Sequence, residues 1–342
     1  MLTRAAIAAS VVVAAALAQF KSSVPLVLAP TTITDSRGRY VDGLHTDDLI
    51  LYDNNVPQPI QLDWTGNPIS LVVAIQASAN SGPVIDKVGR IGILLSQLLA
   101  AASGETAMLS FSDDVKVHQE FTADSDRLTH SLRMLRTEGN NAHTLDAIEQ
   151  ALNLLALRPA SQRRIVLMVG EKRDRGSIAK LPQVLALAQR INATVYWLTF
   201  SSFLEPFTLK PKTKEDLKPE AERIRKTACT LCEQPDETPV PFQPGPGGPI
   251  YAIGELARLH QPDLPPIFTR ATGGRALGFV RKSALENVIQ TIADEVHRQY
   301  MISFEPKSAD DAQPGAFHSI RVAVKGRPDL KVTTRAGYWA LQ

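Results

Sequence analysis

Residues 69–82 of this chain have the sequence ISLVVAIQASANSG, a continuous apolar run that ends abruptly in small polar residues. An apolar run with β-branched members, closed by a polar turn that contains glycine, predicts a fully buried central strand over 71–75. In open α/β sheets, ligands bind where the strands end and the loops fan outward. Gln76, Ser78 and Asn80 therefore occupy a candidate binding position, although none of them carries a charge.

Downstream of this strand, helical and strand periodicities alternate as far as residue 200. Apolar spacing predicts helices over 84–102, 124–136, 144–157 and 178–191. Strands are expected over 106–111, 115–121, 164–169 and 193–200, the first two joined as a hairpin through 112–114. Farther on we expect a helix near 250–259, a connection over 262–266, a short strand over 276–280 and a helix over 285–300. The alternation predicts an α/β fold with a mostly parallel sheet covered on both faces.

The two ends of the chain are richer in β-prone segments. Strands are expected early, over 24–34, 48–52 and 58–64, and late, over 300–304, 318–324 and 330–334. Because no helices separate the late strands, we expect them to pair antiparallel with one another and with the early ones.

The first residues resemble an export signal. Arg4 precedes an apolar run over 5–17, and the Ala-Leu-Ala at 16–18 fits a signal-peptide cleavage site. The run is too short for an ordinary membrane-spanning helix, and no second segment of that length follows. We therefore expect an extracytoplasmic protein, periplasmic or secreted, with an uncleaved membrane anchor as the alternative. The net charge of +2 is not gathered into a basic block, so no nucleic-acid partner is indicated.

The two cysteines, Cys229 and Cys232, lie in a charged, then proline- and glycine-rich insertion over 205–249. In an oxidising compartment such a close pair is expected to form a local disulfide. The alternative is a thiol-disulfide redox site, which would need the motif at a helix start beside a βαβ unit. Haem attachment and a zinc site are excluded, since Glu233 follows the pair and there is no second pair.

Several phrases in order make the chain similar to a von Willebrand factor A domain, specifically the exported bacterial VWFA-related family of acidobacterial type. They are TDSRGRYVDGLHTDDLILYDNNVPQPI at 34–60, the strand ending at Ser78, GEKRDRGS at 170–177, ATGGRAL from 271, HRQYMISF from 297 and RAGY from 335. The resemblance implies a Rossmann-like domain over 67–300, flanked by β segments at 19–66 and 301–342 that pack together, after a signal over 1–18.

Such domains commonly bind a divalent metal at the carboxyl edge of the sheet and use it to capture an acidic group of a partner. The resemblance implies that the first ligand motif, Asp-x-Ser-x-Ser, becomes Gln76-Ala77-Ser78-Ala79-Asn80 here. It places Ala142 at the threonine position, with Thr144 two residues on, and Glu171 where an aspartate belongs.

Hard cations prefer carboxylate oxygens, and these loops hold at most one. We therefore expect a degenerate site with no metal or other cofactor, in which only Ser78 and Glu171 could still act as ligands. Gln76, Ser78 and Asn80 would instead cap the following helix and hydrogen-bond across the loops. Lys172 is a candidate for the vacated cation position.

No nucleophile elbow, phosphate-binding loop or zinc-protease motif occurs, so no catalytic residue is assigned. The leading hypothesis is a non-enzymatic, exported interaction module that contacts a protein or cell-envelope partner at the top of the sheet. The alternatives are a periplasmic thiol-disulfide protein that uses Cys229 and Cys232, and a purely structural envelope protein.

Overall fold

The computed structural model describes residues 26–63, 67–82, 85, 104–200, 262–279, 284–306 and 316–340. The expected signal over 1–18, the insertion over 205–249 with Cys229 and Cys232, and the helix near 250–259 lie outside the described residues, as does nearly all of the helix expected over 84–102. Among the described residues, no helix has the length and apolar character needed to span a membrane.

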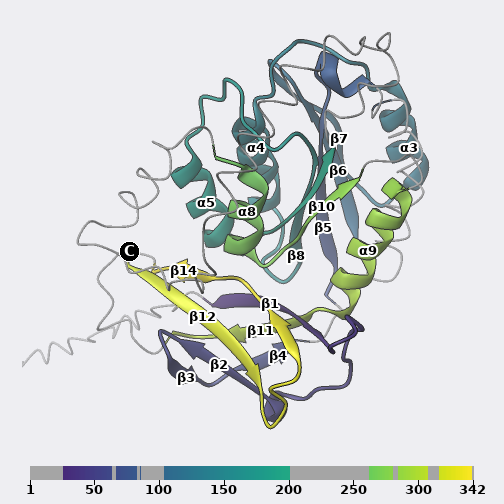
Figure 1. Ribbon diagram of the computed structural model, residues 1–342. Coiled ribbons are helices and arrows are strands. Elements are labelled where there is room, and N and C mark those ends of the chain that lie inside the picture. The colour runs from purple at the N-terminus through teal and green to yellow at the C-terminus, as the bar shows by residue number, and fades with distance from the viewer. Residues whose placement is uncertain are drawn as a thin grey trace, which may run out of the picture.

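A six-stranded sheet lies between helices in the larger part of the molecule (Figure 1). Its spatial order is β10 (Ala276–Phe279), β9 (Thr194–Phe200), β8 (Arg163–Gly170), β5 (Ile69–Gln76), β6 (Glu105–Phe111) and β7 (Val115–Thr122). All neighbours pair parallel except β6 and β7, which form the expected antiparallel hairpin. Every residue of β5 is buried, which confirms the prediction of a buried central strand.

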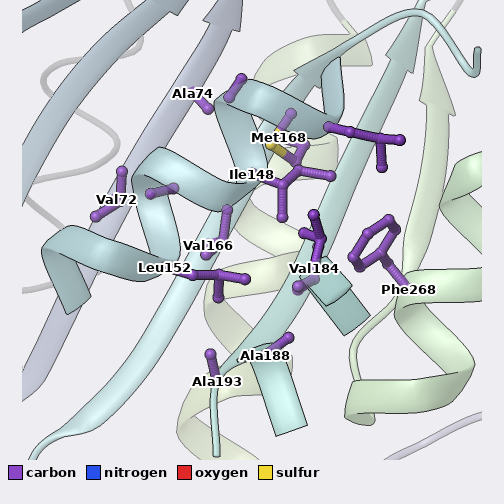
Figure 2. Packing of buried hydrophobic residues seen from close by; sticks show 14 of the residues in the cluster. Val72, Ala74, Ile148, Leu152, Val166, Met168, Val184, Ala188, Ala193 and Phe268 are labelled. Carbon is purple, nitrogen blue, oxygen red and sulfur yellow. The ribbon is translucent and has the colours of Figure 1, made fainter. Parts of the chain in front are cut away.

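Helices cover both faces of this sheet. On one face lie α4 (Thr144–Ala156), α5 (Leu181–Arg190) and α8 (Leu264–Thr272), and on the other lie α3 (Ser125–Met134) and α9 (Ala284–Arg298). Figure 2 shows the first face, where Ile148 and Leu152 of α4 and Val184 of α5 meet strand residues such as Val166. The alternating faces of the strands therefore feed two separate apolar cores, as expected for a mostly parallel α/β sheet.

The connection expected over 262–266 is wrong in part, because helix α8 already begins at Leu264. Pro265 and Pro266 lie in the first turn of this helix, where backbone amides have no intrahelical acceptor and the missing N–H of proline costs nothing. Gly273 then ends the helix in the left-handed conformation with φ 79°. The pair of prolines thus marks a helix start and not a loop.

The early and late strands form two four-stranded sheets that share one apolar core below the large sheet. The first has the order β13 (Lys331–Thr333), β1 (Val27–Thr34), β11 (Tyr300–Phe304), β4 (Gln61–Asp63), and the second has the order β14 (Gly337–Trp339), β12 (Phe317–Val324), β2 (Leu49–Asp53), β3 (Val56–Gln58). A short 3₁₀ helix, η1 (Thr46–Asp48), precedes β2. The single strand expected over 58–64 is divided between β3 and β4, since Pro59 has no amide to donate to a ladder.

Buried polar groups join this sandwich to the amino ends of the parallel strands. At the start of β8, Arg163 donates to Val296 O (2.6 Å) and to Gln299 Oε1 (3.2 Å), just where α9 passes into β11. Arg335 donates to Leu28 O of β1 (3.0 Å) and to Asn192 Oδ1 (3.4 Å), two residues before β9, and burial lowers the pKa of Arg335 to about 10. The sandwich is thus fixed at one end of the sheet, and the carboxyl edge at the opposite end is left to the loops.

Gly337 permits a close backbone approach between β14 and β12. An added Cβ would lie 2.1 Å from His318 O and 2.4 Å from Phe317 Cζ. We expect Gly337→Ala to lower the free energy of unfolding by roughly 2–3 kcal/mol through overpacking, measured by urea denaturation.

The matched control for this change is Gly82→Ala, since a Cβ there meets only Thr137 Cγ2 at 3.9 Å. The control should leave stability unchanged or slightly raised. Equal effects of the two substitutions would contradict the tight junction between β14 and β12.

Candidate functional site

The side chain of Gln76 lies at the carboxyl edge of the sheet, where the strand order reverses between β5 and β8. It is buried, with 1% of its surface exposed. Its Nε2 donates to Ser78 Oγ (2.8 Å), and its Oε1 accepts a hydrogen bond from Glu171 N (2.7 Å). One neutral amide group therefore joins the loop after β5 to the loop after β8.

Gly170, the last residue of β8, makes room for this contact. A Cβ at this position would lie 3.1 Å from Gln76 Oε1 and 3.0 Å from Phe111 Cζ, both tighter than ordinary contacts. The backbone of β8 can therefore approach the amide closely only without a side chain at residue 170.

The loop after β5 is tied to its neighbours through its backbone. Ala77 N donates to Phe111 O (2.8 Å), Glu138 N to Ala77 O (2.7 Å) and Ala79 N to Gly139 O (3.0 Å). Ser78 precedes the short 3₁₀ helix η2 (Ala79–Ser81) but makes no side-chain capping bond to it. The helix that Ser78 was expected to cap, over 84–102, lies almost wholly outside the described residues, and the Ser78 hydroxyl oxygen accepts from Gln76 Nε2. For Asn80, only the backbone lies within the described residues.

The expected threonine-loop residues face the segment after β8. Thr144 is fully buried, and its Oγ1 lies within hydrogen-bond distance of Ala142 O (3.2 Å) and Arg173 O (3.3 Å). Ala142 O also accepts from Arg175 N (2.8 Å). Both residues thus brace the 171–178 loop against the start of α4.

Asp174 and Ser177, which the sequence analysis did not single out, satisfy the first amides of α4. Asp174 Oδ1 accepts from Leu145 N (3.0 Å) and Ser177 Oγ (2.5 Å), and Ser177 Oγ accepts from Asp146 N (3.1 Å). A carboxylate at a helix N-terminus also interacts favourably with the helix dipole. The sequence held one signal for this arrangement. The residue before α4 is His143, which is not one of the favoured N-cap types and makes no side-chain capping bond here.

The carboxylate of Glu171 is paired with an arginine. Glu171 Oε2 lies 3.0 Å from Arg175 Nη2, and only 11% of the glutamate side chain is exposed. Lys172 is exposed, and the structure ties it to the fold through its carbonyl, which accepts from Leu264 N (2.8 Å). The positive charge beside Glu171 is that of Arg175, and the placement of the Lys172 ammonium at the vacated cation position stays a prediction.

Asp113, in the turn between β6 and β7, holds the segment that leads to α4. Its carboxylate accepts from Asn141 N (3.0 Å) and Asn140 N (3.3 Å), and the bond from Asn141 N in particular lowers the pKa of Asp113. Its role is thus to position a loop.

The donor set does not suit a divalent cation. The amide oxygen of Gln76 already accepts from Glu171 N, and the Glu171 carboxylate already pairs with Arg175. Within the described ranges, no three histidine, cysteine, aspartate or glutamate side chains gather into a metal-binding group. Mg²⁺ and Ca²⁺ require several oxygens free to point at the ion, and Gln76 and Glu171 do not supply them.

Residues 74–172 match the family model of the von Willebrand factor type A domain. No curated protein sequence matches the chain. Among solved structures, an aerotolerance-related membrane protein from Bacteroides fragilis with multiple mutations to serine is 12% identical, with 66% of this chain and 99% of that chain covered and a TM-score of 0.39. The conserved hypothetical protein BatB from Bacteroides thetaiotaomicron is 12% identical over 66% and 98%, with a TM-score of 0.40. The SpRpn10 VWA domain is 14% identical over 40% and 79%, with a TM-score of 0.32.

The matched residues run from the middle of β5 to the start of the loop after β8, and so contain Gln76, Ser78 and Glu171 but not Asp174, Arg175 and Ser177. The sheet order and the helices on both faces agree with this match. Residues 74–172 of this chain therefore form a segment of the von Willebrand factor type A domain kind.

Proposed function

We propose that this chain is an exported, non-enzymatic interaction module that contacts a protein or cell-envelope partner through the carboxyl edge of its large sheet, without a bound divalent metal. Domains of this type commonly mediate protein–protein interaction, and the match over residues 74–172 contains the loops at that edge. The signal-like residues 1–18 support export.

The observation that carries the metal-independent part of the proposal is the double contact of Gln76. Its amide provides a donor to Ser78 and an acceptor to Glu171 N, so both loops are held by a group without charge. A metal ion would do the same work through carboxylates, which repel one another unless a cation lies between them. Because the amide of Gln76 is neutral, no cation is needed between the two loops.

The surface around Gln76 is suited to a partner because its backbone is fixed and its rim is exposed. Ala79 and Asn141 are exposed on either side, while their amides are bonded to Gly139 O and to Asp113. A surface whose loops are already ordered loses little conformational entropy on binding.

Divalent metals should not bind at this site. Calorimetric titration with Mg²⁺, Ca²⁺ or Mn²⁺ should show no binding tighter than about millimolar, and a chelator should leave the unfolding midpoint unchanged. Micromolar binding that is lost in Gln76→Ala or Glu171→Ala would overturn the proposal. Asp329→Ala is the control, since Asp329 is an exposed carboxylate on the sandwich that pairs with Arg327.

A partner should cross-link at the rim of the site. With a photo-crosslinking phenylalanine derivative in place of Ala79, irradiation of intact cells should yield a discrete protein adduct, because residue 79 is exposed beside Gln76. The same derivative in place of Thr333, exposed on β13 at the other end of the molecule, should yield none. Equal adducts from both positions, or none from position 79, would contradict a partner at the carboxyl edge.

A further inference from the structure

The loop over 171–178, between β8 and α5, directs its acidic side chains inward and its basic side chains outward. Asp174 accepts from Leu145 N in the first turn of α4, and Glu171 is 11% exposed and paired with Arg175. Lys172 is exposed, and the Arg173 and Arg175 side chains are 62% and 46% exposed. The outward face of this loop is therefore cationic although its sequence contains both signs of charge.

The backbone of this loop is held at several points along its length. Leu264 N donates to Lys172 O (2.8 Å), Thr144 Oγ1 lies within hydrogen-bond distance of Arg173 O (3.3 Å), and Arg175 N donates to Ala142 O (2.8 Å). At its end, Ile178 N and Ala179 N donate to the Asp146 carboxylate. The long side chains thus project from a fixed frame, and ordering the backbone costs nothing when a ligand binds.

The same loop ends in an exposed apolar side chain. Ile178 is 84% exposed, although its own backbone is fixed by Asp146. Among the residues that the structure describes, Arg173 pairs with the carboxylate of Asp263, at 3.6 Å, and both side chains are about half exposed or more. Such a surface ion pair contributes little stability, so the Arg173 guanidinium can exchange this carboxylate for another.

We propose that the 171–178 loop binds an acidic segment of a protein partner, with Lys172 and Arg173 pairing with its carboxylates and Ile178 contacting an apolar side chain between them. This inference rests on the proposed function and adds the chemistry of the partner. A protein segment fits better than a nucleic acid or a lipid surface, because the cationic area is a single short loop with one apolar residue. Guanidinium groups favour the planar geometry of carboxylates.

The test measures the affinity of the full chain for a fluorescent peptide of aspartate, glutamate and leucine. A neutral peptide of asparagine, glutamine and leucine serves as its control, and both are measured in the presence of a chelator. The acidic peptide should bind, and K172Q/R173Q should weaken its binding by about tenfold or more, because two cation–carboxylate contacts are lost. I178A should weaken it by a few fold, and binding should fall as salt rises.

The control is K325Q/K331Q, which removes the same charge from exposed positions of the sandwich and should leave the affinity unchanged. The inference would be overturned if the two peptides bound equally or if both double variants weakened binding equally. It would also be overturned if K172Q/R173Q still bound the acidic peptide and anionic lipid vesicles tightly. If no peptide binds while the adduct at position 79 still forms, this inference fails and the proposed function stands.

Discussion

The contact of the Gln76 amide with Ser78 Oγ and Glu171 N is the constraint on which the arrangement of the carboxyl edge depends. It spans the point where the strand order reverses, which is where two neighbouring loops diverge and a crevice would otherwise open. A primary amide can donate and accept at once, so it satisfies both loops without a counterion. Leaving the buried amide of Glu171 without an acceptor would cost about 1–3 kcal/mol, so the interaction also stabilises the fold.

The other charges at this edge are consistent with a site without metal. Arg175 neutralises Glu171, and Asp174 lies against the N-terminus of α4, so neither carboxylate is free to coordinate an ion. Because both acids turn inward, the basic residues of the same loop face solvent. The neutral side chain at position 76 and the cationic outer surface of the 171–178 loop are thus parts of one electrostatic arrangement.

Periodicity alone predicts the parallel sheet, its buried central strand and the helices on both faces, because long amphipathic patterns depend only on local spacing. Periodicity fails at residues that are compatible with two kinds of structure. Pro265 and Pro266 favour a loop in the sequence but begin α8 in the structure, and Pro59 separates β3 from β4 within a segment that reads as one strand. The positions of Gln76, Ser78 and Glu171 follow from the strand ends. The capping of α4 by Asp174 and the pairing of Arg175 with Glu171 depend on tertiary contacts that local spacing does not encode.

Hydrogen exchange at the amide of Glu171 tests the central claim most directly. In the wild-type protein this amide should be protected by its bond to Gln76 Oε1. In Gln76→Ala its exchange should accelerate by about tenfold or more, while amides in the middle of β5, such as that of Val73, keep their protection. Unchanged protection of the Glu171 amide in this variant would contradict the account, because the two loops would then be held together without the glutamine.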